Sequence, residues 1–304
     1  MYDVIGDIHG NAVLLEKMLF ELGYVEDNGI YSHPSRTAIF LGDLIDKGNE
    51  ARKVLGIVRP MVENDKARCI LGNHEYNMVA YHTQDEDGNY LREHTDGNYF
   101  QIKESLDVFQ EYKDELDDHL EWFQTLPIFI EEDNIRIIHA TWYTGGIELI
   151  RHKYSENCLT DELLYASAID GSPEFKAIEF LLKGQEIQLP DGLSFEDNKG
   201  KERFDFRIKW WEVLLGKSYE YAAVRSDGIL FPLNNVKRVR PDCSYAAEER
   251  PVFFGHYCLP EDPMLYKPNV CCLDYCIYNT NRLVAYRFDG EQELDEAKLV
   301  LVTA

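Results

Sequence analysis

Acidic, amide and imidazole side chains follow five apolar runs of this chain. The first run, VIGDIHGN at residues 4–11, delivers an aspartate and a histidine between two glycines. The side chains that follow the five runs are Asp7 and His9, Asp43 and Asp46, Asn73 and His74, His139, and His256. An acid and an imidazole are costly to bury unpaired, and glycine lets the backbone approach a ligand closely. We therefore interpret these groups as the arms of one ligand site.

The mixture of donors is typical of a site for divalent metals. Carboxylate and amide oxygens combined with imidazoles suit first-row ions, with manganese as the first choice and iron, zinc, cobalt or nickel as alternatives. The six candidate ligands are Asp7, His9, Asp43, Asn73, His139 and His256. They are too many for one ion with an open position and suit two ions that share a carboxylate, for which Asp43 is the natural bridge. Two such ions polarise a phosphoryl oxygen and lower the pKa of bound water, which is the chemistry of phosphoester hydrolysis.

Three strand–loop–helix units must position the first of these donors. We predict strands at YDVIG (2–6), TAIFLGD (37–43) and ARCILGN (67–73), each followed by a helical segment, the second of them over about 49–64. Asn11 is placed to cap the first helix. Repeated units of this kind form an α/β core whose loops gather at the carboxyl ends of the strands.

The remainder of the chain is predicted to be mixed. Residues 99–125 are expected to be helical, and residues 126–143 are expected to form a hairpin. Two helices, at 161–169 and 173–183, and a hairpin at 183–211 follow, and apolar strands resume in PVFFGHY, NVCCLDYCIY and RLVAYRF. This order predicts a single domain whose core comes from about 1–144 and 251–304. Residues of about 145–250 would form an insertion or cap.

Composition excludes several classes of partner. Of 304 residues, 31 are Lys or Arg and 55 are Asp or Glu, which gives a formal net charge of −24 and disfavours extended nucleic acid. There is neither an apolar run of membrane-spanning length nor a recognisable signal peptide, so we expect a cytoplasmic protein without a membrane partner. The seven cysteines are irregularly spaced, and Cys271, Cys272 and Cys276 are interpreted as reduced core thiols.

Taken in order, GDIHG, GDLIDKG, GNHE, the isolated His139 and the Gly-His pair at 255–256 resemble the motifs of calcineurin-like metallophosphoesterases. The match is closest to the phosphoprotein-phosphatase branch, which includes the bacterial diadenosine tetraphosphatases, and it covers about 1–140 and 250–290. The resemblance implies a four-layer α/β/β/α sandwich with the metals at its strand-end loops.

The resemblance also implies roles for individual residues. Asp7 and His9 would hold the first metal, Asp43 would bridge, and Asn73, His139 and His256 would hold the second. His74 would be the general acid that protonates the leaving oxygen, and Asp46 would orient its imidazole. Glu75, in the first turn of a helix, is interpreted as structural.

The chain departs from the family pattern at three places. Lys47 stands where relatives usually have arginine, and it offers a point charge in place of a bidentate fork. Cys258 stands where many relatives have a second metal-binding histidine, and ATWY follows His139 in place of a glycine pair. Phosphate binding is assigned to Lys47 and Asn73, assisted by cations of the 183–211 segment. That segment carries Lys201, Arg203, Arg207 and Lys209, of which Arg203 and Arg207 are the best candidates.

These observations predict a two-metal phosphatase. Its substrates would be phosphomonoesters, including phosphoserine or phosphothreonine in proteins. A dinucleoside polyphosphate is the alternative substrate. A non-catalytic module that binds a protein partner through the insertion is a further alternative.

Overall fold

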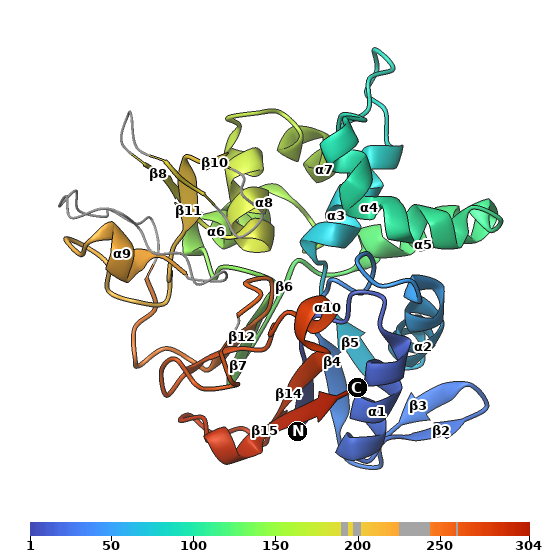
Figure 1. Ribbon diagram of the computed structural model, residues 1–304, viewed down its shortest axis with the longest axis vertical. Helices are drawn as coiled ribbons and strands as arrows, with labels where there is room; N and C mark the ends of the chain where they lie inside the picture. Colours follow the sequence, from blue (N-terminus) through green and yellow to red (C-terminus); the bar gives the residue numbers. More distant parts are fainter. Residues whose placement is uncertain (190–193, 197–201, 225–243, 260) are drawn as a thin grey trace.

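The computed structural model describes a two-sheet α/β protein, in residues 1–189, 194–196, 202–224, 244–259 and 261–304 (Figure 1). The first sheet has five strands in the order β15-β14-β1-β4-β5. They are β15 (Leu299–Thr303), β14 (Arg282–Phe288), β1 (Tyr2–Ile5), β4 (Thr37–Phe40) and β5 (Ala67–Cys69). Strands β1, β4 and β5 run parallel, whereas β14 pairs antiparallel with β1. The C-terminal part of the chain thus completes the N-terminal sheet.

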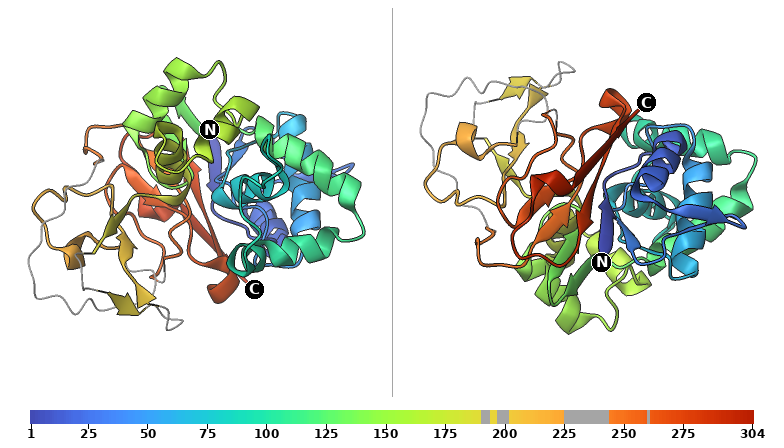
Figure 2. Two further views of the ribbon diagram at one scale, coloured as in Figure 1. Left: turned by 90° about the horizontal axis from the view of Figure 1, so that it is seen from above. Right: turned by 90° about the horizontal axis from the view of Figure 1, so that it is seen from below.

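The second sheet has four strands in the order β13-β12-β7-β6. They are β13 (Val270–Cys272), β12 (Val252–Phe254), β7 (Ile135–Ile138) and β6 (Phe129–Glu132). The ring of Phe253 on β12 lies 5.1 Å from that of Tyr286 and 5.6 Å from that of Phe288, both on β14. These contacts place the two sheets face to face, as the further views also show (Figure 2). The expected α/β class is confirmed.

Helices α1 (Ala12–Leu22) and α2 (Ala51–Glu63) follow β1 and β4, as the sequence predicts. The side-chain oxygen of Asn11 accepts the backbone N–H of Leu14 at 3.0 Å, which caps the start of α1. Gly23, with φ of 89°, ends the helix in the left-handed conformation that glycine adopts without strain. The third helical segment is α3 (Asn73–His82), and it begins within the GNHE motif.

The helical structure predicted for 99–125 is confirmed, and it is divided between two helices. They are α4 (Asp96–Phe109) and α5 (Lys113–Thr125), and Tyr112 between them has a non-helical φ of −130°. The break lets the chain fold back, so that the ring of His119 on α5 contacts Phe109 on α4. Helix α6 (Thr144–Lys153) and the short hairpin of β2 (Val25–Asp27) and β3 (Ile30–Ser32) were not predicted.

The middle of the chain contains α7 (Asp161–Ser167), α8 (Pro173–Lys183) and α9 (Tyr219–Ala222). It also contains two small antiparallel pairs, β8 (Glu186–Gln188) with β11 (Asp205–Arg207), and β9 (Phe195–Glu196) with β10 (Glu202–Arg203). The rings of Trp210 and Trp211 lie 5.1 and 5.2 Å from that of Phe254 on β12. The tryptophan pair therefore anchors this segment to the second sheet. The core and cap boundaries at about 145 and 250 stay a prediction.

Short elements complete the C-terminal region, namely α10 (Ile277–Thr280) and the 3-10 turn η1 (Glu296–Lys298). Among the residues described, none of the helices combines the length and the apolar character needed to cross a bilayer.

Candidate metal centre

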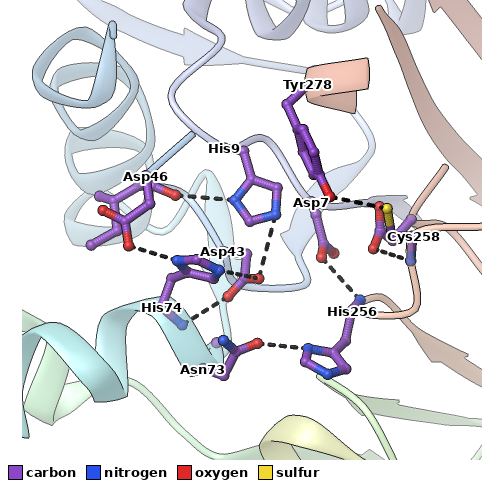
Figure 3. A network of polar contacts seen from close by, with 12 residues as sticks. Asp7, His9, Asp43, Asp46, Asn73, His74, His256, Cys258 and Tyr278 are labelled. Atoms are coloured by element: carbon purple, nitrogen blue, oxygen red, sulfur yellow. Dashed lines mark hydrogen bonds and ion pairs between the residues drawn. The ribbon is translucent and has the colours of Figure 1, made fainter. Parts of the chain in front are cut away.

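Asp43 lies between two groups of imidazoles, in the loop that follows β4 (Figure 3). Its Oδ2 is 3.6 Å from Nε2 of His9 and 3.9 Å from Nε2 of His74. Its Oδ1 is 3.3 Å from Nε2 of His139 and accepts the backbone N–H of His74 at 3.0 Å. The two carboxylate oxygens of Asp43 therefore face different neighbours.

Two sets of donors converge closely enough to hold an ion, and they share Asp43. One set is His9, Asp43 and His74, and the other is Asp43, His139 and His256, with the donor atoms of each set within 4.8 Å of one another. The first set contains His74 where the sequence interpretation places Asp7. Asp7 lies beside both sets, where its Oδ2 accepts the backbone N–H of His256 at 2.9 Å (Figure 3).

Asn73 joins the two histidines of the second set. Its side-chain oxygen is 3.1 Å from Nε2 of His139 and 2.6 Å from Nδ1 of His256. The other nitrogen of His139, Nδ1, is 2.7 Å from the carbonyl oxygen of Leu41. This carbonyl fixes the orientation of the His139 ring, as is common for metal-binding histidines.

The backbone is bent into rare conformations at this site. Non-glycine residues with positive φ include His9 (45°), Asp43 (50°), Asp46 (67°), Lys47 (65°) and His256 (70°). Such conformations are strained for residues with a Cβ atom, and they cluster at functional sites. The surrounding structure must therefore hold these side chains in place.

Glu75 provides part of that support. Its Oε2 accepts the backbone N–H groups of Asp43 at 2.9 Å and Gly72 at 3.1 Å, and its Oε1 accepts that of Leu44 at 2.8 Å. Burial raises the pKa of Glu75 to about 7. Gly72 is required here, because a Cβ atom at that position would lie 2.3 Å from the backbone nitrogen of Asp43. These contacts agree with a structural role for Glu75.

His74 and Asp46 form a buried pair beside Asp43. Nδ1 of His74 is 2.6 Å from Oδ2 of Asp46. Ser105 on α4 makes two hydrogen bonds with Asp46, because its hydroxyl donates to Oδ1 at 2.5 Å and its oxygen accepts the backbone N–H at 2.8 Å. With Nδ1 engaged, the Nε2 atom of His74 is directed toward Asp43.

Burial and close charges shift the pKa values of these groups in opposite directions. Burial raises the pKa of Asp7, and the charge of Asp274 adds to the effect. Despite burial, His139, His74 and His9 hold the pKa of Asp43 well below its usual range. Burial lowers the pKa of His9 to about 3. Burial also opposes the charged form of His139, but the charges of Asp43 and Asp7 and the hydrogen bonds with Asp43 and Leu41 together raise its pKa to about 10. Asp43 is therefore ionised, and neighbouring positive charge stabilises its carboxylate.

Two buried polar atoms at the centre have no hydrogen-bond partner within the described part of the chain. They are Oδ1 of Asp7 and Nε2 of His256. Buried polar atoms are almost always satisfied, so unpaired ones need an explanation such as a bound ion. Together with the shared Asp43, they fit a centre built for two cations.

A model of the family described as calcineurin-like phosphoesterase matches residues 2–258. The chain belongs to this family. The resemblance inferred from the ordered motifs is thereby confirmed.

Shorter similarities connect this family member to individual proteins. Bis(5'-nucleosyl)-tetraphosphatase PrpE of Oceanobacillus iheyensis is 44% identical over 73 residues, which are 24% of this chain and 29% of that protein. The protein of the same name from Bacillus subtilis is 35% identical over 81 residues, 26% of this chain and 33% of that protein. The matched part thus spans about a third or less of these relatives.

The fold is shared with a solved structure of low sequence identity. A mutant of a cold-active protein tyrosine phosphatase has a TM-score of 0.50 at 13% identity, over 96% of this chain and 79% of that one. A protein serine/threonine phosphatase from Saccharomyces cerevisiae has a TM-score of 0.48 at 12% identity, over 99% and 78%.

Cations from three separate segments act electrostatically on residues of the centre. Besides burial and the carboxylate of Asp43, the charge of Lys47 influences the pKa of both His9 and His74. Burial lowers the pKa of His256, and the charge of Arg207 on β11 lowers it further. Arg92, a residue that the sequence interpretation missed, interacts electrostatically with Asp46.

The two insertion arginines differ in position. Nε of Arg207 lies 3.4 Å from Oε1 of Glu186, and its charge also reaches His256. Arg203 acts on Glu186, whose pKa is raised chiefly by burial. Lys201 lies outside the described residues. Of the insertion cations, the contacts therefore favour Arg207 as a neighbour of the centre.

Three further residues of the site carried no usable sequence signal. Ser105 lies on a helix 59 residues from its partner Asp46. Asp274 accepts the backbone N–H groups of Cys258 at 2.6 Å and Cys276 at 2.9 Å. The ring of Tyr278 lies 5.8 Å from that of His9 in an edge-on contact. Asp274 and Tyr278 both stand in the NVCCLDYCIY motif, which marked a strand and gave no indication of a site.

The interpretation of Cys276 as a reduced core thiol is wrong. Cys276 forms a disulfide with Cys258, with their Cα atoms 4.3 Å apart. The physical reason is that β12 and β13 are adjacent parallel strands, so the loops that follow them meet. Cys271 and Cys272, in contrast, are fully buried thiols, as predicted.

Proposed function

We propose that this protein is a phosphoester hydrolase that uses two divalent metal ions. The observation that carries the proposal is the position of Asp43, whose two oxygens face two donor sets. The His74–Asp46 pair beside the same carboxylate supplies a candidate proton donor. A metal centre with an acid at its edge is the minimum that two-metal hydrolysis requires.

The proposed ligands form two groups, one for each metal ion, and both groups include Asp43. Asp7 and His9 would hold one ion, and Asn73, His139 and His256 would hold the other, with Asp43 shared. Manganese is our first choice, because oxygen donors and imidazoles are mixed in both sets. When bound, such ions polarise a phosphoryl oxygen and activate a water molecule.

His74 would act as the general acid. Its Nδ1 is engaged by Asp46, so the proton to be transferred resides on Nε2, on the side of Asp43. Although burial opposes it, the charges of Asp43 and Asp46 raise the pKa of His74. The raised pKa favours the protonated imidazole, which could protonate the departing oxygen.

Lys47, Arg92 and Arg207 would bind the negative charge of the substrate. They come from three different segments and act electrostatically on residues of the centre, in a chain whose formal net charge is −24. Local positive charge in so acidic a protein supports recognition of a compact anion over a long polyanion. Asn73 would add an amide contact to the phosphoryl group.

The substrate we propose first is a phosphomonoester, including phosphoserine or phosphothreonine in proteins. The similarity to proteins named bis(5'-nucleosyl)-tetraphosphatase favours a second candidate, a dinucleoside polyphosphate. A non-catalytic binding module is less favoured, because all the ligand positions and the His74–Asp46 pair are present. We place the protein in the cytoplasm, without membrane or extended nucleic acid as a partner.

The deciding experiment combines metal analysis with a substrate panel. The purified chain is loaded with manganese, its metal content is measured, and it is offered an aryl phosphate, a phosphothreonine peptide and diadenosine tetraphosphate. We expect about two ions per chain and phosphate or nucleotide release that Asp43→Asn abolishes together with metal binding. A chain that holds two ions and hydrolyses none of these compounds would contradict the hydrolase and favour the binding module.

A further inference from the structure

Cys258 lies at the rim of the candidate metal centre (Figure 3), and it forms a disulfide with Cys276. Cys258 follows His256 by two residues, and Cys276 precedes Tyr278 by two. The hydroxyl of Tyr278 is 3.2 Å from Sγ of Cys258. The disulfide is therefore connected to the site through His256, which is close in sequence, and through the contact with Tyr278.

Tyr278 in turn contacts two residues of the site. Its ring meets the ring of His9 edge-on at 5.8 Å, and Nζ of Lys47 lies 5.6 Å from the ring centre. A cation held over an aromatic face is attracted to it, so the position of the ring influences the position of the lysine. Lys47 is one of the three cations to which we assign the substrate phosphate.

The fold brings the two cysteines together without needing the bond. Strands β12 and β13 are paired in register, with Phe254 opposite Cys272, so the loops that follow them start side by side. The Asp274 carboxylate accepts the backbone N–H groups of both Cys258 and Cys276. Opening the disulfide would therefore leave the loops in place, which favours reversible formation over a purely structural role.

The other described cysteines are poor competitors for oxidation. Cys69, Cys271 and Cys272 are buried, and burial raises the pKa of each of these thiols, which disfavours the reactive thiolate. Cys158 is partly exposed, but burial and Glu156 raise its pKa to about 11. In a reducing compartment such as the cytoplasm, disulfides that do form are usually transient and serve redox sensing or catalysis.

We propose that Cys258 and Cys276 are a reversible thiol–disulfide pair that controls substrate affinity through Tyr278 and Lys47. A low-molecular-weight disulfide such as glutathione disulfide is the oxidant. One cysteine thiolate attacks it and releases one thiol, and the second cysteine then displaces the other thiol from the mixed disulfide. The two cysteine thiols lose two protons and two electrons, and one small disulfide becomes two small thiols.

The oxidised state, which the structure shows, fixes the Sγ atom that contacts Tyr278. In the reduced state the Cys258 side chain can rotate, and its contact with the Tyr278 hydroxyl is lost. The contacts of Asn73 with His139 and His256, and of His139 with the Leu41 carbonyl, do not involve the disulfide, so metal content should not change. We expect reduction to raise KM by about three- to tenfold, in line with the loss of one hydrogen-bonded contact, and to leave kcat nearly unchanged.

The test uses the manganese-loaded full chain in a C158S/C243S background, which removes Cys158 and the cysteine outside the described residues. Samples are equilibrated in glutathione buffers from fully reducing to oxidising. Alkylation and peptide mass mapping report the state of the pair. KM for an aryl phosphate and the affinity for inorganic phosphate, measured by calorimetry, are followed in the same samples. Both affinities should weaken as the pair becomes reduced.

Two variants separate the pair from its proposed effect. Cys276→Ser should show the reduced-state KM and phosphate affinity in every buffer. Tyr278→Phe keeps the ring but loses the contact with Sγ, so its pair should still titrate while KM no longer follows it. Circular dichroism and the metal content of each variant check that it is folded and loaded.

Several results would overturn the proposal. A pair that stays in one state across all buffers is not reversible, and equal phosphate affinity in both states would show that the pair does not act on the site. A Tyr278→Phe variant that responds like the parent would exclude Tyr278 as the connection. Mass mapping and phosphate binding need no turnover, so a failure of the proposed hydrolase activity would be distinguished from a failure of this inference.

Discussion

Nδ1 of His74 lies 2.6 Å from Oδ2 of Asp46, and both side chains are buried beside the carboxylate that the two donor sets share. The pairing fixes the tautomer and the orientation of the imidazole. It therefore gives the proposed general acid a specific geometry that substitutions can test.

Replacing His74 by asparagine should separate proton transfer from metal binding. His74→Asn removes the proton donor, so turnover of alkyl phosphates, which have poor leaving groups, should fall by about 100-fold or more. Turnover of p-nitrophenyl phosphate should fall much less, because its leaving group needs little protonation. Metal content, measured by elemental analysis, should stay at the parental value. A variant that loses metal would show that His74 is a ligand, as its place in the first donor set allows.

Removing the hydroxyl of Ser105 should loosen the same pair without touching the proposed ligands. Ser105→Ala leaves Oδ1 and the backbone N–H of Asp46 without their partner, so we expect kcat to fall by about tenfold with KM little changed. Ser167 offers a matched control, because it is also buried and its hydroxyl donates to the Leu164 carbonyl. Steady-state kinetics in which Ser167→Ala loses as much activity as Ser105→Ala would contradict a specific positioning role.

Arg207 and Arg203 should differ in their effect on substrate affinity. Arg207→Ala removes a charge that reaches His256, so KM for an aryl phosphate and the inhibition constant of inorganic phosphate should rise by about tenfold. Arg203→Ala, whose described electrostatic partner is Glu186, should change both constants much less. Equal effects of the two substitutions would indicate a general loss of positive charge from the insertion.

Asp289 should contribute stability that depends on pH. Its Oδ1 is 2.5 Å from Nη1 of Arg36 and its Oδ2 is 3.0 Å from Nζ of Lys298, and these bonds lower its pKa from 3.8 to about 2. Because the pKa is lower in the folded state, the stabilisation is present above about pH 4 and is lost as the pH falls toward 2. Asp289→Asn should thus lower Tm at pH 7 by about 1–3 °C and have little effect near pH 2.

Thermal unfolding followed by circular dichroism measures this difference. Asp262→Asn is the matched control, because Asp262 pairs with Arg282 but is fully exposed, so its removal should change Tm little at either pH. A Tm loss for Asp289→Asn that persists unchanged at pH 2 would show that the charge is not its cause.

The features predicted best from the sequence are those that depend on residues close together in the chain. Asp7, Asp43 and Asn73 each follow a short apolar strand, and parallel strands bring such residues to one edge of a sheet. That reasoning anticipated both the α/β class and the convergence of the donors. The asparagine cap of α1 at Asn11 was likewise readable, because capping requires only neighbouring residues.

Features that depend on long-range contacts could not be read in this way. The break between α4 and α5 reflects packing of His119 against Phe109 and carries no glycine or proline signal. The approach of Ser105 to Asp46 follows from the placement of α4, and the pairing of Cys258 with Cys276 follows from that of β12 and β13. Each of these contacts joins segments whose relative position is set only by the folded core.

The pairing of β1 with β14 has a consequence for how the protein is made. Asp3 lies opposite Arg287, so one edge of β1 has no partner until the ribosome has extended the chain past that residue. His256 and Asp274 are also synthesised late. We therefore expect metal uptake to follow translation past Arg287, and we expect the nascent segment that contains β1, with an open strand edge, to need protection from aggregation until then.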